Sequence, residues 1–300
     1  MKKVPLLKLL PVFFGVFIFF AANAQNLPNV QQISLRAPVG IKIDGRTTEW
    51  NNQFQAYNTH TDFYYTMAND DKNLYVVIQA TDPAIIRRII NGGVTLTINR
   101  SGQKKDKDGM SITYPSFEKN NRFIPNLGRV SVGAAFSRLN SFTSYSGGVT
   151  VIRDSRDGGN TIGTSGTATK SPPVNTDSLA IVNNNNMANK AKYIRVNGIK
   201  DVDSLISVYN ADGIKAASSF DSKLAYTYEL AIGLKQLNLS VSNPVKFAYQ
   251  LMINDVVVHG VTSYSYDQAG NVTGMRYVKT DVGMASQSAT DFWGEYTLAK

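Results

Sequence analysis

The sequence predicts an all-β protein, an antiparallel β-sandwich, on three observations. Tyr, Phe, Val, Ile and Thr recur in short runs. The 23 glycines, with frequent Asn and Asp, separate these runs as tight turns do. Hydrophobic residues make up 43% of the 300 residues and aromatic residues 10%, which is enough for a globular core. We therefore expect a single β-sandwich domain over residues 25–300, with one or two short helices.

The first 24 residues have the pattern of a secretory signal peptide. Lysines precede an apolar run over 9–20, and Ala22 and Ala24 supply small residues for cleavage. This run is shorter than the roughly 20 residues that a membrane-crossing helix needs. We expect a mature chain that begins at Gln25, has no membrane span and is secreted or periplasmic. The chain has no cysteine, which excludes a lipid-anchoring thiol, disulfides and zinc thiolates.

The N-terminal half predicts strands, one hairpin and one helix. Five short runs have the composition of strands: 33–37, 41–43, 63–68, 74–80 and 94–99. The Asn- and Asp-rich segment 69–73 joins two of them as a hairpin turn. Asp82 and Pro83 are typical of a helix N-cap and first helical residue, so a short helix is expected over 84–90.

The second half begins with a change of composition. A Gly- and Asn-rich stretch around 140–190 contains few apolar runs, so we expect a long irregular insertion or mobile loop there. Strand-like runs then return, each bounded by Gly, Asn, Asp or Pro: 191–198, 205–209, 224–232, 245–253, 256–266 and 272–278. These strands complete the predicted sandwich.

Three segments, 43–50, 69–76 and 291–298, resemble the carbohydrate-binding module family 9-like domains, a β-sandwich group related to DOMON domains. The resemblance covers most of the mature chain, although the middle third departs from it. The residues that carry it are expected to be structural: Asp44, Gly45, Trp50, Asp70, Asp71, Leu74, Tyr75 and Trp293. Trp50 and Trp293 are the only tryptophans, and we expect both to anchor the sandwich core.

The resemblance implies an exported, non-catalytic protein that binds glycans or polysaccharide. Sugar-binding members hold a terminal sugar between two tryptophans, but the matching segments here, 89–93 and 284–288, contain no aromatic residue. Tyr264 and Tyr266 are the candidates for a replacement binding surface. The alternative is a structural or protein-interaction sandwich that has lost the sugar clamp. A haem-binding DOMON relative, using His259 with Met67, is a third and less favoured hypothesis.

Other activities have little support in the sequence. Asp70 and Asp71 leave calcium open as a cofactor, but turn formation is the favoured role because no array of six or more oxygen ligands accompanies them. No catalytic motif or pair of matched carboxylates stands out, so we expect no enzyme. The formal charge is +9, yet Lys and Arg form no clustered stripe, which argues against a nucleic-acid partner.

Overall fold

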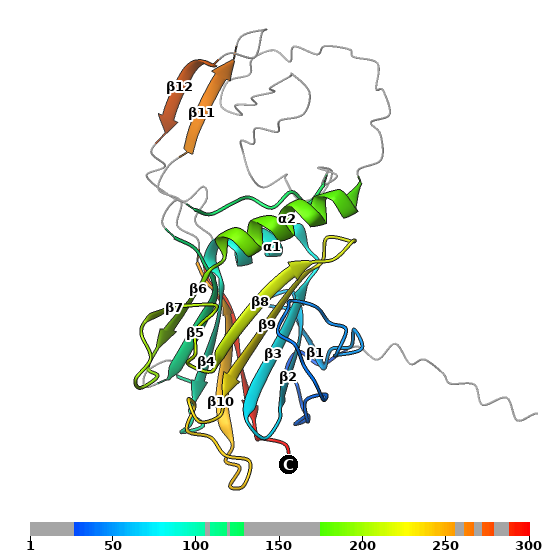
Figure 1. Cartoon of the computed structure of the whole chain (residues 1–300), viewed down its shortest axis with the longest axis vertical. Helices are drawn as coiled ribbons and strands as arrows, with labels where there is room; N and C mark the ends of the chain where they lie inside the picture. Colours follow the sequence, from blue (N-terminus) through cyan, green and yellow to red (C-terminus); the bar gives the residue numbers. More distant parts are fainter. Residues whose placement is uncertain are drawn as a thin grey trace, which may run out of the picture.

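Two antiparallel sheets packed face to face form a β-sandwich (Figure 1). The computed structural model describes residues 27–105, 109–118, 121–128, 175–255, 261–266, 272–278 and 288–300, with the backbone alone in 261–266 and 272–278. The five-stranded sheet has the order β1 (Ala56–Asn58), β2 (Phe63–Asn69), β3 (Asn73–Ala80), β9 (Tyr226–Gly233) and β8 (Ile214–Phe220). The six-stranded sheet has the order β13 (Thr290–Tyr296), β10 (Phe247–Ile253), β4 (Val94–Asn99), β5 (Met110–Ser116), β6 (Tyr193–Asn197) and β7 (Leu205–Ser207). A separate hairpin pairs β11 (Val261–Tyr266) with β12 (Val272–Val278).

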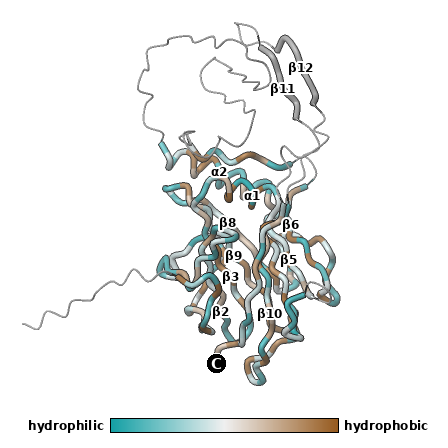
Figure 2. Tube along the Cα trace, turned by 180° about the vertical axis from the view of Figure 1, so that it is seen from behind, coloured by the Kyte–Doolittle hydropathy of each residue, from teal (hydrophilic) through white to brown (hydrophobic). Residues whose placement is uncertain are grey.

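The core lies between the two sheets. Side chains alternate between the faces of a strand, so each strand contributes every second residue to this layer, and hydropathy varies along the chain accordingly (Figure 2). The largest fully buried side chains include four tyrosines and two phenylalanines: Tyr65, Tyr226, Tyr228, Tyr249, Phe63 and Phe247. Burial of each large apolar side chain contributes about 1.5–3 kcal/mol to the stability of the fold. The chain has no cysteine, so packing of this core takes the place of disulfides.

A second, smaller cluster covers the outer face of the five-stranded sheet. Trp50 packs there against Tyr75, Val77, Ala68 and Ala231 from the sheet. The N-terminal segment supplies the other side chains of this cluster: Leu35, Ala37, Ile41, Ile43 and Phe54. The segment before β1 is therefore a cover over one sheet.

Two helices lie at the same end of the sandwich, opposite the C-terminus (Figure 1). Helix α1 (Pro83–Gly92) begins where predicted, because Oδ1 of Asp82 accepts hydrogen bonds from the N–H groups of Ala84 and Ile85 at 2.7 and 3.1 Å. Helix α2 (Thr176–Lys190) packs against β8. The predicted helix is confirmed, and so is the β-sandwich.

Two sequence predictions are wrong. Segments 33–37 and 41–43 are not strands; they form only the isolated bridge between Arg36 and Asn69, and their apolar residues pack into the cover. The irregular insertion ends earlier than expected, since α2 occupies 176–190. Asn183 and Asn184 have weak helix propensity, but their side chains bond to Asn126 and Phe220, so tertiary contacts hold them in a helix. The predicted signal peptide, residues 1–24, and residues 129–174 lie outside the described residues.

Candidate functional site

The segment with Asp44, Gly45 and Trp50 is held by one buried carboxylate. Glu229 is 1% exposed, and its Oε2 accepts hydrogen bonds from the N–H groups of Asp44 and Gly45 at 3.0 and 2.8 Å. Its Oε1 accepts from the indole Nε1 of Trp50 at 2.9 Å. Burial raises the pKa of Glu229, although these donors act in the opposite direction. Glu229 therefore fastens the N-terminal cover to β9.

Gly45 is required at this turn for two reasons. Its φ is +80°, a conformation that L side chains rarely adopt. A Cβ there would lie 2.5 Å from the backbone of Ser218 and of Ser219 on β8. The Asp44-Gly45 pair thus serves close packing of the cover on the sheet, and its expected structural role is consistent with this geometry.

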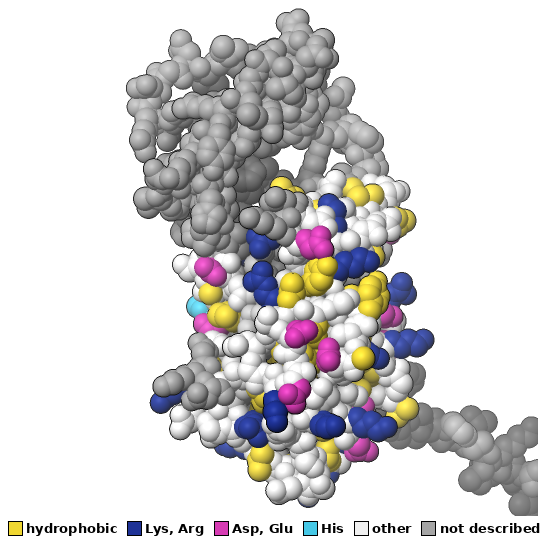
Figure 3. Space-filling model, turned by 60° about the vertical axis from the view of Figure 1, so that its left-hand side comes forward, with side chains coloured by type: hydrophobic (Ala, Val, Ile, Leu, Met, Phe, Trp, Pro, Cys, Tyr) yellow, Lys and Arg dark blue, Asp and Glu magenta, His cyan; other side chains and the backbone are white. Residues whose placement is uncertain are grey.

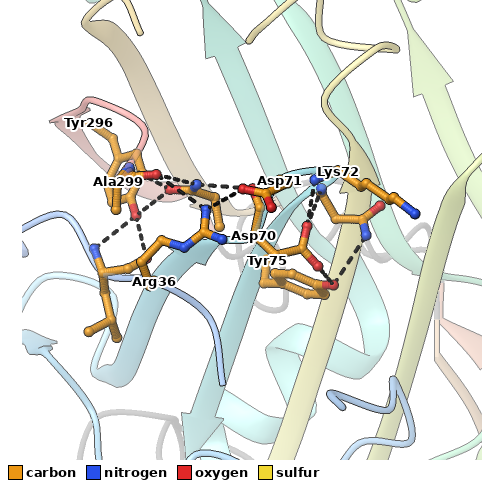
Figure 4. A network of polar contacts seen from close by, with 10 residues as sticks. Arg36, Asp70, Asp71, Lys72, Tyr75, Tyr296 and Ala299 are labelled. Carbon is orange, nitrogen blue, oxygen red and sulfur yellow. Dashed lines mark hydrogen bonds and ion pairs between the residues drawn. The ribbon is translucent and has the colours of Figure 1, made fainter. Parts of the chain in front are cut away.

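Asp70 builds the β2–β3 hairpin turn (Figure 4). Its Oδ1 accepts from the N–H groups of Lys72 and Asn73 at 2.7 and 2.6 Å, and its Oδ2 accepts from the hydroxyl of Tyr75 at 2.7 Å. Burial raises its pKa, but these hydrogen bonds outweigh burial and leave the pKa lowered. Leu74 of β3 is fully buried in the core. Asp70 thus has the turn role that the sequence favoured.

The same turn meets the chain's C-terminal segment. Asp71 pairs with Arg36 at 2.9 Å, and Oδ1 of Asn69 accepts from the N–H of Ala299 at 2.8 Å and from the hydroxyl of Tyr296 at 3.2 Å (Figure 4). Within the residues described, no group of three or more His, Cys, Asp or Glu side chains is placed to hold a metal ion. The calcium hypothesis gains no support from this turn.

The two tryptophans differ in environment. Trp50 is 5% exposed within the cover, so its expected role as a buried anchor is confirmed. Trp293 is half-buried and belongs to neither core cluster, so the same prediction for Trp293 is wrong. The reason is the alternation of β13: Phe292 and Tyr296 point into the core, which directs Trp293 to the outer face of the six-stranded sheet.

A pocket of about 450 Å³ lies beside this indole, and we call it the Trp293 pocket. It is lined by residues 30–34, Lys104, Lys246 and 293–297. Glu295 lies between two cations, with Oε2 2.8 Å from Nζ of Lys246 and Oε1 3.6 Å from Nζ of Lys104. The hydrogen bond from Lys246 and the charges of both lysines lower the pKa of Glu295. The pocket thus combines a flat aromatic ring with charged acceptors and donors.

Buried hydrogen bonds fix both walls of the Trp293 pocket. Nε2 of Gln31 donates to the carbonyl of Met67 at 2.8 Å, and Oε1 of Gln31 accepts from the N–H of Met67 at 2.7 Å. These two bonds hold the wall formed by residues 30–34. The hydroxyl of Tyr65 accepts from the N–H of Gln31 at 2.8 Å and lies 2.9 Å from the hydroxyl of Tyr249. The ring of Tyr249 fills the space beside Gly294, where a Cβ would lie 2.3 Å from that ring. Both walls of the pocket are therefore anchored in the core.

A larger open groove, of about 1380 Å³, runs along β8, and we call it the β8 groove. One wall is the turn over 44–48, and the other is formed by α2 together with Val208 and Tyr209. The side chain of Tyr209 is 76% exposed. The groove therefore separates the N-terminal cover from α2.

Tyr264, Tyr266 and the haem pair are the remaining candidate site residues. Tyr264 and Tyr266 lie on β11, but their side chains are outside the described part of the chain. Of the haem pair, His259 also lies outside it, whereas Met67 is fully buried in the core. Of the described residues, no helix is long and apolar enough to cross a membrane.

Charged side chains of both signs are mixed on the face seen in Figure 3, with no large area of one sign. Comparisons with known protein families, with curated proteins and with solved structures give no match for this chain. The site must therefore be interpreted from its own chemistry.

The sequence held a signal for Trp293 that its interpretation as a core residue overlooked. In the run 290–296 a period of two groups Phe292, Gly294 and Tyr296 on one face. The same period places Trp293 with Asp291 and Glu295 on the polar face. Lys104, Lys246 and the 30–34 segment reach the pocket only through the tertiary fold, and no local pattern in the sequence marks them.

Proposed function

We propose that the chain is an exported, non-catalytic glycan-binding β-sandwich of the family 9-like type, with the Trp293 pocket as its binding site. The observation that carries the proposal is the half-buried indole on a polar outer face of the sheet. The resemblance of segments 43–50, 69–76 and 291–298 to the family 9-like sandwiches adds support.

The chemistry of the pocket suits a sugar. A pyranose ring has an apolar face that stacks on an indole, and hydroxyls around its rim that both donate and accept hydrogen bonds. Lys246 and Glu295 offer a donor and an acceptor beside the ring, and Gln32, Ser34 and Thr297 add neutral polar side chains. A volume of about 450 Å³ is within the range of small-ligand pockets, so one or two sugar units are the expected occupants.

The direct test is a glycan array together with pull-down on insoluble polysaccharides, using the chain as processed by an exporting host. We expect saturable binding to one class of glycan, and loss of that binding in Trp293→Ala. Trp293→Phe keeps a flat ring and is expected to retain part of the affinity.

Tyr209→Ala is the matched control, because it removes an exposed ring from the β8 groove and leaves the Trp293 pocket intact. Binding that survives Trp293→Ala but not Tyr209→Ala would move the site to the β8 groove. A folded chain that binds no glycan would instead favour the protein-interaction role.

Export has its own test. The leader pattern predicts that the N-terminus of the chain recovered from the periplasm or medium is Gln25. Mass spectrometry of the purified protein measures this directly. A mature chain that still carries residues 1–24 would refute the signal-peptide assignment.

A further inference from the structure

The outer edge of β8 lines the β8 groove, and its hydrogen-bonding pattern can be read from the β8–β9 ladder. The N–H of Gly233 donates to the carbonyl of Gly213 at 2.9 Å, and the N–H of Asp221 donates to the carbonyl of Ala225 at 3.0 Å. Both pairs belong to the same antiparallel register, in which hydrogen-bonded and non-bonded pairs alternate. The odd-numbered residues of β8 therefore bond to β9, and the even-numbered residues direct their main-chain groups away from it.

Amide side chains occupy both ends of this outward edge. Oδ1 of Asn184 accepts from the N–H of Phe220 at 2.7 Å, and its Nδ2 donates to the carbonyl of Phe220 at 2.9 Å. At the other end, Nδ2 of Asn210 donates to the carbonyl of Ile214 at 2.7 Å. Asn184 thus makes the pair of bonds that a residue of a neighbouring strand would make.

The middle of the edge has no partner strand among the described residues. No residue in the described ranges hydrogen-bonds to the N–H or carbonyl of Ala216 or Ser218, and both residues line the β8 groove. Ala216 is only 8% exposed, and main-chain groups in such surroundings need a partner. The neighbours Ala217 and Ser219 are also small, so another backbone can approach closely. Ala is depleted in strands, so these short side chains contribute little strand preference of their own.

We propose that the β8 groove binds an extended peptide segment, which adds a short strand to the free edge at Ala216 and Ser218. Only main-chain amides in an extended chain present N–H and carbonyl groups at the spacing of this edge. A three-residue strand is sufficient, since β1 and β7 of this protein have that length. The edge is recessed between α2 and the 44–48 turn, so a single segment fits it better than the sheet of a second copy.

The groove also specifies a side-chain pattern for the peptide. Side chains directly opposite Ala216 and Ser218 point to the same face as these residues, toward the apolar wall formed by Met187, Ala191 and Val208. The residue between them faces the polar outer wall of the groove. The charged lining has three cations, Arg46, Lys215 and Lys223, and two carboxylates, Asp44 and Asp221, so a small positive excess remains. The expected motif is apolar–polar–apolar, flanked by acidic residues.

The experiment measures binding of capped Glu-Val-Thr-Val-Glu to the full exported chain by calorimetry. The control peptide is N-methylated at both Val nitrogens, which blocks the main-chain hydrogen bonds and keeps the side chains. We expect binding of the first peptide and at least about tenfold weaker binding of the second, because each lost hydrogen bond costs severalfold in affinity. Equal binding of the two peptides, or binding of neither at millimolar concentration, would overturn the proposal.

A protein variant supplies the second readout. Ser218→Pro removes an outward N–H, a position at which edge strands tolerate proline, together with a hydroxyl that donates to the hydroxyl of Tyr114 at 3.4 Å. It should weaken the peptide at least about tenfold while the chain stays folded, and Ser218→Ala, which removes the hydroxyl alone, should leave peptide binding unchanged. Ala217→Pro removes an N–H of the β8–β9 ladder and should unfold the edge. Trp293→Ala should leave peptide binding unchanged, because Trp293 does not line the β8 groove. Failure of the glycan proposal can therefore be told apart from failure of the peptide proposal. A dimer in sedimentation that Ser218→Pro dissolves would assign the edge to a second copy and refute the peptide.

Discussion

Glu229→Gln tests how the N-terminal cover is fastened to the sheet. The substitution keeps the shape of the side chain but replaces one acceptor oxygen with an NH₂ donor. Oε2 of Glu229 serves two main-chain N–H groups and Oε1 serves the indole of Trp50. The best orientation of the amide therefore turns its oxygen to the main chain and its NH₂ against the indole N–H.

The magnitude follows from these three bonds. One charge-assisted bond is lost, its buried donor is left unpaired, and the other two bonds become neutral. The unpaired indole N–H costs about 1–3 kcal/mol, and relief of the buried charge offsets part of this loss, so a net cost of about 1–2 kcal/mol remains. For a domain of this size such a cost lowers Tm by about 2–8 °C.

Thermal and urea unfolding of Glu229→Gln beside Glu295→Gln would measure the effect. Glu295 is exposed, so its substitution controls for the loss of one charge. We expect a fall in Tm of this size only for Glu229→Gln, with tryptophan fluorescence reporting release of the cover. Equal and small effects of the two substitutions would refute the reasoning that Glu229 holds the cover.

Three further predictions concern stability. Gly45→Ala should lower the free energy of unfolding by at least about 3 kcal/mol, and Gly40→Ala by only about 1 kcal/mol. Both glycines have positive φ, but only at Gly45 would a Cβ lie 2.5 Å from backbone atoms. Urea unfolding of the two variants measures the difference, and equal losses would contradict the packing argument. Trp50→Ala should lower the free energy of unfolding by about 3–5 kcal/mol, as for a core residue, and Trp293→Ala by about 1 kcal/mol. Similar falls of Tm in the two variants would show that Trp293 is a core residue after all. The pKa of Glu229 is raised on folding, so the folded state holds this proton more tightly than the unfolded state. Stability should therefore rise, relative to Glu229→Gln, as the pH falls through the folded pKa toward 4.5, and a relative fall would show that hydrogen bonds outweigh burial.

Alternating apolar patterns predicted much of the fold. Strands such as β3 and β10 are rich in aromatic and β-branched residues, so their local preference and their burial agree. Strand β8 was not predicted because Ala216, Ala217, Ser218 and Ser219 have little strand preference, and tertiary contacts, above all pairing with β9, hold them extended. Helix α2 was not predicted for a related reason, because its asparagines are held by partners far away in the sequence.

The candidate site was less predictable than the fold. Trp293 was recognised as important, but its motif was taken as evidence of burial, although the period of two along β13 places it on the polar face. The edge at Ala216 and Ser218, which has no partner strand among the described residues, is defined by the ladder register and by the two asparagine contacts. Neither the register nor these contacts has a local signature in the sequence.

The most direct test of the central claim is a fluorescence titration of the purified protein with the polysaccharide that it retains best. The chain has only two tryptophans, and Trp50 is buried, so a change on sugar binding reports on Trp293. The account predicts a saturable blue shift and protection from acrylamide quenching, both absent in Trp293→Phe. Saturable binding with unchanged fluorescence and full quenching of Trp293 would contradict it.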